Sequence, residues 1–238
     1  METANAPGPQ DTRTDRGGHG AQDARSAAAD NRSVRDPAAE PPHRIRAVHT
    51  ETTVTVYQAY PPEIGLAAAR DGRFPEPWKR DRMTWVKPSF LWMMYRCGWA
   101  TKAGQETVLA VEIERAGLEW ALEHACLAHY RRGLHPDRAA WQRLLRRSPA
   151  RVQWDPERDL RLRPLPYRSL QLGLAGEAAR RYADEWTVSV TDVTPLVHRI
   201  HGLLRDGEPE AARSLLPAER AYPVRPGALA HLGGDGPG

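Results

Sequence analysis

One short stretch of the chain, Arg82–Trp99, combines cationic and aromatic side chains in a way that suits an anionic ligand with a planar ring. It contains three of the eight tryptophans, and the three lysines of the protein lie in or beside it. Between Lys79 and Lys102, six cationic side chains stand against a single acid, Asp81. Lysine and arginine donate to phosphate oxygens, and a tryptophan face stacks on a ring. The stretch therefore predicts the location of a binding site.

Some of the side chains that could contact such a ligand also have a purely structural explanation. Lys87 precedes a Pro-Ser step that is typical of a helix start, and a helix N-terminus attracts phosphate. We therefore expect a phosphate contact at Lys87 or Ser89, with surface decoration and local capping as the alternative. Further candidates are cationic (Arg46, Arg82, Arg96), amide (Gln58) or aromatic (Tyr57, Trp85, Trp92). For Trp92 core packing is the simpler interpretation, and Arg46 could equally be an edge charge of a strand.

The charge of the chain is unevenly distributed. The net charge is +4, from 34 Lys and Arg against 30 Asp and Glu. Residues 1–42 hold five arginines and seven acids, which leaves 29 against 23, or +6, for the remainder. A basic folded part favours anionic partners such as nucleotides or nucleic acid. Coding from GC-rich DNA would also replace lysine by arginine, so this signal has a second explanation.

Composition also divides the chain into three parts. Residues 1–42 have almost no large apolar side chain apart from Val34, which predicts a disordered N-terminal tail. We expect one domain over residues 43–216 and a loose C-terminal tail over residues 217–238. Two distant cysteines and scattered histidines provide neither a disulfide framework nor a metal-ligand set, which favours the cytoplasm and predicts no metal. No apolar run of eighteen residues is present, so we expect no membrane span.

Hydrophobic periodicity predicts a mixture of strands and helices without regular β-α-β alternation, and hence a single α+β domain of small sheets flanked by helices. The expected strands are residues 43–49, 52–57, 83–87, 108–113, 152–154, 168–172 and 185–190. The expected helices are residues 61–70, 88–95 with an end near residue 98, 117–130, 137–147, 176–183 and 193–204. Trp141, Leu144 and Leu145 should face inward from the helix over residues 137–147.

Four of these segments resemble one known family. VYQAY at 56–60, RMTWVKPSFLWMMYRCGWATK at 82–102, RSLQLGL at 168–174 and DEWTVSVTDVT at 184–194 are similar to domain of unknown function 4291. The similarity extends from about Arg44 to about Leu204, and the second segment is long and specific. This resemblance implies no activity.

A weaker resemblance, in the order of motifs, is to the ADP-ribosyltransferases, which bind NAD between two small sheets. It implies that Gln58 stands where that superfamily has an NAD-contacting His or Arg, and that Ser89 or Tyr95 belongs to the second motif. It further implies that Glu185, at the head of a late strand, is the catalytic acid. The sequence departs from the superfamily at position 58 and in the adjacent Asp184-Glu185 pair.

Three functional hypotheses follow. The first is an enzyme that transfers ADP-ribose from NAD, or performs related nucleotide chemistry. Its basic Arg82–Arg96 region would hold phosphates while Glu185 stabilises a ribosyl cation. The second is a nucleic-acid-binding module in which the same Lys and Arg side chains contact the phosphate backbone and the Trp side chains stack on bases. The third is a small interaction protein without catalysis.

Overall fold

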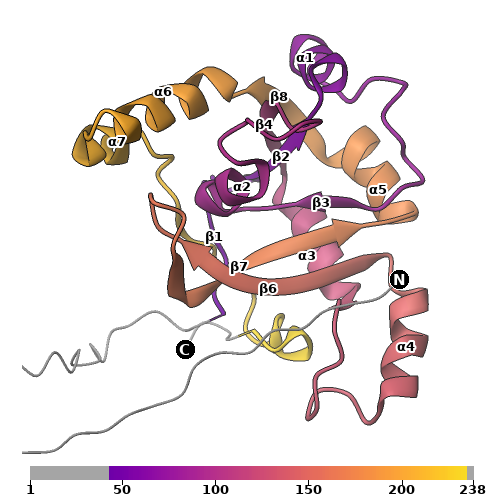
Figure 1. Cartoon of the computed structure of the whole chain (residues 1–238). Coiled ribbons are helices and arrows are strands. Elements are labelled where there is room, and N and C mark those ends of the chain that lie inside the picture. Colours follow the sequence, from indigo (N-terminus) through magenta and orange to yellow (C-terminus); the bar gives the residue numbers. More distant parts are fainter. Residues whose placement is uncertain (1–42, 235–238) are drawn as a thin grey trace, which may run out of the picture. The chain divides into compact units, whose positions relative to one another are not determined.

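The computed structural model describes residues 43–234, so the expected tail at residues 1–42 lies outside the described residues. Three sheets organise these residues (Figure 1): a two-stranded β1–β9 ribbon, a three-stranded β2–β4–β8 sheet and a four-stranded β3–β7–β6–β5 sheet. The strands are β1 (Arg46–Ala47), β2 (Thr53–Tyr60), β3 (Thr84–Val86), β4 (Thr107–Glu114), β5 (Ala125–Leu127), β6 (Ala150–Arg158), β7 (Pro164–Leu174), β8 (Thr187–Asp192) and β9 (Arg220–Ala221).

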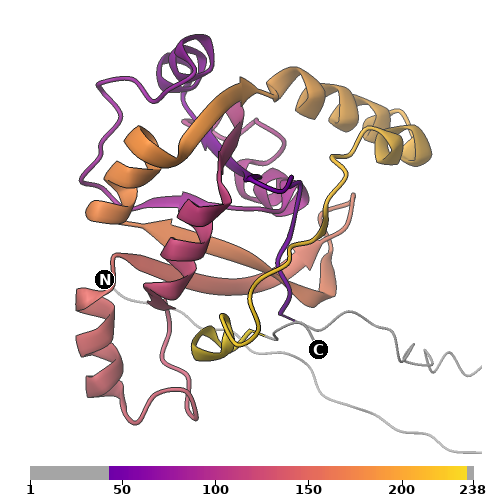
Figure 2. The same cartoon turned by 180° about the vertical axis from the view of Figure 1, so that it is seen from behind.

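Helices surround these sheets, which confirms the α+β class. Seen from behind in Figure 2, α3 crosses the strands, while α4 stands apart beside the four-stranded sheet. The helices are α1 (Pro62–Asp71), α2 (Phe90–Cys97), α3 (Arg115–Glu123), α4 (Arg138–Arg147), α5 (Glu177–Arg181), a π-helical turn (Tyr182–Trp186), α6 (Thr194–Arg205), α7 (Pro209–Ser214) and a 3-10 turn (Ala230–Leu232). Within residues 43–234, none of them is both long and apolar enough to cross a membrane.

A short backbone pairing joins the two larger sheets. Tyr57 in β2 and Lys87 just after β3 form an isolated antiparallel bridge. The amide of Tyr57 donates to the carbonyl of Lys87 at 2.7 Å, and the amide of Lys87 donates back at 3.2 Å. Pro88 has no amide hydrogen and Ser89 caps α2 by accepting from the Trp92 amide at 3.1 Å, so the chain turns from strand into helix here. This turn places α2 beside the junction of the sheets.

The hydrophobic core has two parts, one on each side of this junction. The larger packs the strands against α3 and includes Val54, Val111 and Leu118. The smaller surrounds α2 and α6 and includes Met94 and Ile200. Apolar residues on α2 at helical spacing therefore serve as core, as expected for that helix.

One predicted helix is shorter than expected, because its last part forms a strand that pairs with a sheet. The helix expected over residues 117–130 ends at Glu123, and β5 follows at once. All three residues of β5 are buried, and they pair in parallel with β6. An apolar run that continues a helical pattern cannot be distinguished from a buried strand by periodicity alone. The predicted helix is therefore confirmed up to Glu123 and wrong for Ala125–Leu127, which form a strand.

Two further predictions differ from the structure, one for the apolar face of α4 and one for the C-terminal segment. No residue of α4 is buried, and Leu144 is 38% exposed, so the apolar face predicted to point inward does not enter the core. The segment after residue 216, expected to be loose, instead contributes β9 and the buried side chains of Tyr222, Leu229 and Leu232. Its partner β1 lies near the other end of the domain sequence, and local composition cannot predict a pairing between such distant segments.

Gly117 in α3 offers a test of this packing. A Cβ there would lie 2.4 Å from the indole ring of Trp186, which is buried and has no room to retreat. We expect Gly117→Ala to lower the free energy of unfolding by about 1–3 kcal/mol, measured by denaturant titration.

The control is Gly202→Ala in α6, where a Cβ would meet no atom within 4 Å. That change should raise stability by about 0.5–1 kcal/mol, because alanine favours a helix over glycine. Equal effects of the two substitutions would contradict the packing of α3 on Trp186.

Candidate functional site

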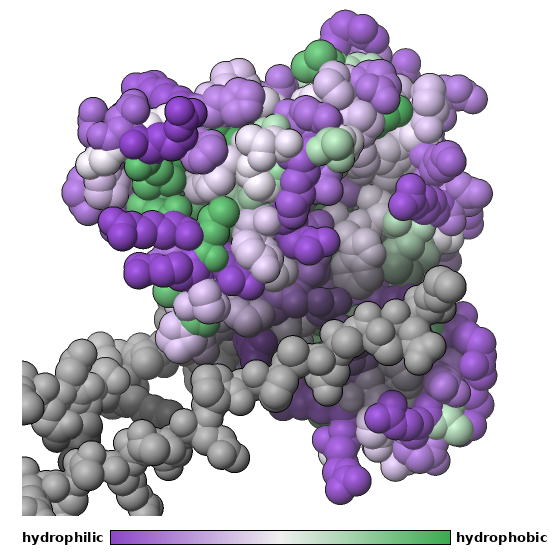
Figure 3. Space-filling model, viewed as in Figure 1, coloured by the Kyte–Doolittle hydropathy of each residue, from purple (hydrophilic) through white to green (hydrophobic). Residues whose placement is uncertain are grey.

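A pocket of about 1100 Å³ opens where the two larger sheets meet. Its walls come from β2, β3, β6 and β7, with α2 and the loop before β3 at its rim. Hydrophilic residues predominate on the face shown in Figure 3, with separate hydrophobic areas that include one near α6 and α7 and one near α1. The pocket is thus a polar concavity between sheets, of a size that suits a ligand as large as a nucleotide.

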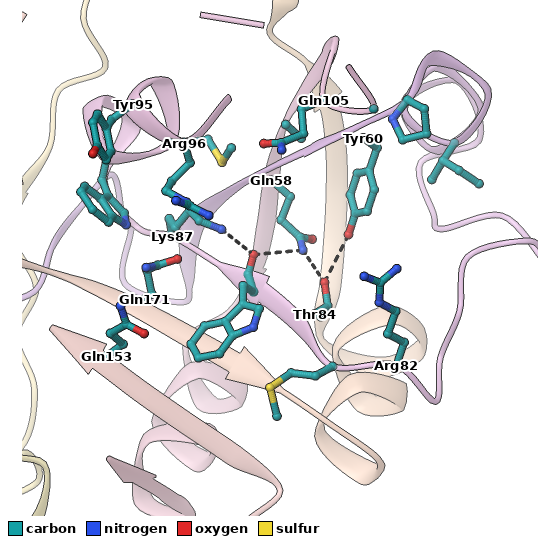
Figure 4. A pocket seen from close by; sticks show the side chains of 18 of the residues that line it. Gln58, Tyr60, Arg82, Thr84, Lys87, Tyr95, Arg96, Gln105, Gln153 and Gln171 are labelled. Atoms are coloured by element: carbon teal, nitrogen blue, oxygen red, sulfur yellow. Dashed lines mark hydrogen bonds between the residues drawn. The ribbon is translucent and has the colours of Figure 1, made fainter. Parts of the chain in front are cut away.

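A chain of hydrogen bonds fixes the floor of the pocket (Figure 4). The Gln58 amide nitrogen donates to Thr84 Oγ1 at 2.6 Å and to the Trp85 carbonyl at 3.3 Å. The Gln58 amide oxygen accepts from the hydroxyl of Tyr182 at 2.6 Å. Tyr60 extends the chain through a 3.3 Å contact with Thr84. Because Gln58 is 3% exposed and both of its polar atoms are bonded, the side chain is locked across the sheet junction.

Lys87 stands beside this chain with its amine in the pocket. Its Nζ donates to the same Trp85 carbonyl oxygen at 3.0 Å, and its side chain is buried. Burial, and secondly the positive charge of Arg96, lower the pKa of Lys87 to about 7, while Asp155 acts in the opposite direction. The amine of Lys87 therefore holds its proton less tightly than an exposed lysine does.

One end of the pocket gathers arginines and an unpaired donor. Arg96 projects toward Lys87 in Figure 4, and the guanidinium of Arg158 lies 3.7 Å from the ring centre of Tyr95 and 5.2 Å from that of Trp92. Among the described residues, neither Trp92 Nε1 nor Arg158 Nε has a hydrogen-bond acceptor, although both are buried. A buried donor left unpaired costs about 1–3 kcal/mol, so this end is prepared for an acceptor such as an anionic oxygen.

The carboxylate in the pocket is that of Asp155. Gln153 Nε2 donates to it at 2.8 Å and Gln171 Nε2 at 2.5 Å, one to each oxygen. Gln153 and Gln171 are register partners on β6 and β7, which explains why their amides converge on one acid. The two amides hold the carboxylate in one orientation.

The Trp85 ring occupies the space over a glycine. Trp85 on β3 is paired with Gly173 on β7, and a Cβ at Gly173 would approach the ring to 3.1 Å. The absence of a side chain at position 173 thus lets the indole lie close to β7. The ring forms part of the pocket wall as a flat aromatic surface.

The structure brings together six of the residues expected at the site and leaves four elsewhere. The six that line the pocket are Gln58, Arg82, Trp85, Lys87, Trp92 and Arg96. The four that do not are Arg46, Tyr57, Ser89 and Glu185. Gln58 serves the structure itself, because both its amide atoms are engaged within the protein.

Three of the four displaced residues surround two acids at the N-terminus of α2, the buried Glu157 and the half-buried Glu219. Glu219 accepts from the Phe90 amide at 2.6 Å, and Arg46 donates to the Glu219 backbone carbonyl at 3.1 Å. Burial raises the pKa of the neighbouring Glu157, and hydrogen bonds from the Arg158 amide and from Ser89 oppose this shift only in part. Tyr57 is buried against Phe90. The N-terminus of α2 is therefore occupied by a carboxyl group of the protein, whereas Lys87, the other residue expected to contact a phosphate, lines the pocket.

Glu185 lies away from the pocket. The predicted strand begins at Thr187 instead, and Glu185 falls in the π-helical turn before it. Its side chain is 60% exposed and pairs with Arg181 at 3.0 Å. Glu185 therefore does not share a site with Gln58 and Lys87, because the turn directs it to solvent.

Sequence reasoning missed Asp155, Arg158, Gln153 and Gln171. The one available signal was their setting, because polar residues alternate along β6 and Gln171 interrupts the apolar run of β7. Such polar residues are also typical of a solvated sheet face, and only the pairing of β6 with β7 distinguishes the two. Within residues 43–234, no group of three or more His, Cys, Asp or Glu is placed to hold a metal ion.

Comparison with known families identifies the chain. Residues 44–222 match the family described as Domain of unknown function (DUF4291), and the chain belongs to that family. No curated protein matches it. The matched span begins just before β1 and ends just after β9, so it includes every strand described above.

The acid pair beside α2 predicts a pH-dependent stability. Burial, with the nearby Glu157, raises the pKa of Glu219 to about 8. A carboxyl whose pKa is raised on folding stabilises the fold fully below its ordinary pKa and loses that contribution as pH rises toward 8. We expect Glu219→Gln, which retains an oxygen acceptor for the Phe90 amide, to raise stability at pH 8 by on the order of 1 kcal/mol.

At pH 5 the variant and the parent should unfold at similar denaturant concentrations, since Glu219 is then protonated in the folded protein. Urea titrations at both pH values measure the difference. A variant that loses stability equally at both would show that Glu219 is charged in the fold.

Proposed function

We propose that the pocket binds a nucleotide, and that NAD is the class of nucleotide on which the protein acts. The observation that carries the proposal is the meeting, in one pocket of about 1100 Å³, of arginines, an aromatic wall and one oriented carboxylate. Each of these groups corresponds to one part of such a ligand.

The arginines suit the phosphates. Arg82, Arg96 and Arg158 line the pocket from three different elements, so they can approach a diphosphate from several sides. The unpaired Trp92 Nε1 adds a neutral donor at the same end as Arg158. Hydrogen bonds from charged donors to phosphate are about twice as strong as neutral ones.

The aromatic wall suits the rings. The Trp85 indole, held over Gly173, presents a flat surface that can stack on adenine or nicotinamide. Tyr60 lines the pocket on the side of Arg82, as Figure 4 shows. Stacking tolerates either ring, so it supports the nucleotide class without selecting a base.

The carboxylate suits the chemistry of a glycosidic bond. In NAD cleavage the bond between ribose C1′ and nicotinamide breaks, its electron pair leaves with the nicotinamide nitrogen, and positive charge develops on the ribose. Asp155, oriented by two amides, can stabilise that charge and accept the proton of an attacking hydroxyl or water. In this proposal Asp155 takes the role that the sequence assigned to Glu185.

Ligand binding is tested by thermal unfolding with NAD, ADP or a single-stranded oligonucleotide. NAD and ADP should raise the midpoint in proportion to the logarithm of their concentration, since they bind the folded protein alone. Arg96→Ala should weaken NAD binding about 10- to 100-fold through loss of a charged hydrogen bond. Arg199→Ala removes the same charge from an exposed position on α6 outside the pocket and serves as the control.

A shift produced by the oligonucleotide alone, with steep dependence on salt, would replace the proposal by nucleic-acid binding. No shift with NAD or ADP would contradict the nucleotide pocket.

The catalytic role is tested by two matched substitutions, Asp155→Asn and Glu185→Gln, with release of nicotinamide from NAD as the measurement. Asp155→Asn should reduce the rate at least about 100-fold. Glu185→Gln should leave it unchanged, because that side chain faces solvent. A rate that falls with Glu185→Gln and not with Asp155→Asn would show that Glu185 is the catalytic acid.

A further inference from the structure

Lys87 has an environment that an ordinary phosphate-binding lysine does not have. Its backbone is fixed by the bridge to Tyr57, and its side chain is 7% exposed. Within residues 43–234, its amine makes one hydrogen bond, to the Trp85 carbonyl, and no ion pair. A phosphate-binding lysine is useful as a permanent positive charge, and burial next to Arg96 works against that charge.

The same environment suits a nucleophile. A neutral amine attacks electrophilic carbon, and burial beside another cation is a known way to keep a lysine neutral at physiological pH. The rigid backbone and the single hydrogen bond hold the amine in one position facing the pocket. Asp155 is the carboxylate that lines the same pocket, and its charge acts on Lys87.

We infer that Lys87 is the reactive amine of the pocket and forms a reversible imine with the aldehyde or ketone group of an anionic ligand. The amine lone pair forms the new C–N bond, and the carbonyl oxygen leaves as water with the two amine hydrogens. Asp155 relays those protons. Water restores the amine by the reverse steps, so no oxidant or reductant is needed.

This inference rests in part on the proposed function, because the arginines that would hold a nucleotide also select an anionic carbonyl compound. The open-chain form of a ribose freed at C1′ is an aldehyde attached to phosphate, and it belongs to this class. Any other aldehyde that carries phosphate or carboxylate belongs to it too.

The three lysines of the chain make the test direct, since Lys79 lines the same pocket but is exposed, and Lys102 is exposed outside it. The full-length protein is treated at pH 7 with pyridoxal 5′-phosphate or with periodate-oxidised ADP, a dialdehyde. Imines are trapped with sodium cyanoborohydride, and modified peptides are quantified by mass spectrometry. We expect Lys87 to be modified at least about tenfold faster than Lys79 or Lys102, because an amine in water stays protonated at this pH.

The rate of labelling at Lys87 should rise between pH 6 and 8 as its amine loses a proton. The charged or titratable groups that act on this amine are Arg96 and Cys97 on α2 and Asp155 on β6. Lys87→Arg should abolish fast labelling, and Lys79→Arg should leave it intact. Similar labelling of all three lysines, or preference for Lys79, would overturn the inference, and this mapping does not depend on the folding of any variant.

The two probes separate this inference from the proposed function. Fast labelling of Lys87 by both, slowed by an excess of ADP, supports a reactive lysine in a nucleotide pocket. Fast labelling by pyridoxal phosphate that ADP does not slow supports the reactive lysine and contradicts the nucleotide. A thermal shift with ADP together with unreactive Lys87 supports the nucleotide and overturns the lysine.

Discussion

The junction between the two larger sheets depends on two adjacent residues of β2. The Tyr57 backbone pairs with Lys87, and the Gln58 side chain binds β3 and Tyr182 at once. Apart from these contacts, β3 is attached to β2 by the 3.3 Å hydrogen bond between Tyr60 and Thr84 and by packing. Because buried polar groups are costly when unpaired, the contacts admit one arrangement of the strands. The positions of Lys87 and Trp85 follow from that arrangement.

Helix α2 separates two polar environments with opposite character. On its pocket side, Arg158 Nε and Trp92 Nε1 are buried donors without acceptors among the described residues. At its N-terminus, the buried Glu157 and the half-buried Glu219 bring two acids close together. The Glu219 carboxyl group there accepts a hydrogen bond from the Phe90 amide in the first turn of the helix. The protein thus supplies its own ligand at one end of α2 and leaves the adjoining pocket open to an external one.

The sequence predicted the parts of this structure that depend on neighbouring residues. Pro88 and Ser89 indicated the start of α2, and the cationic and aromatic residues of 82–99 located one wall of the pocket. It did not reveal what depends on strand pairing. Asp155 owes its place to the register of β6 with β7, and Glu219 reaches α2 from the far end of the domain. Glu185 was misplaced because a π-helical turn delays the strand by two residues, which alternation in EWTVSV does not show.

The β1–β9 ribbon has a consequence for how the protein is made. Arg46 is opposite Ala221, so the first strand of the described fold pairs with the last. During synthesis β1 leaves the ribosome early, and its partner is still missing until nearly the whole family domain has been translated. Contacts this distant in sequence form slowly, because a long loop must close before they contribute. The pairing of β1 with β9 is therefore expected to be among the last contacts to form during folding.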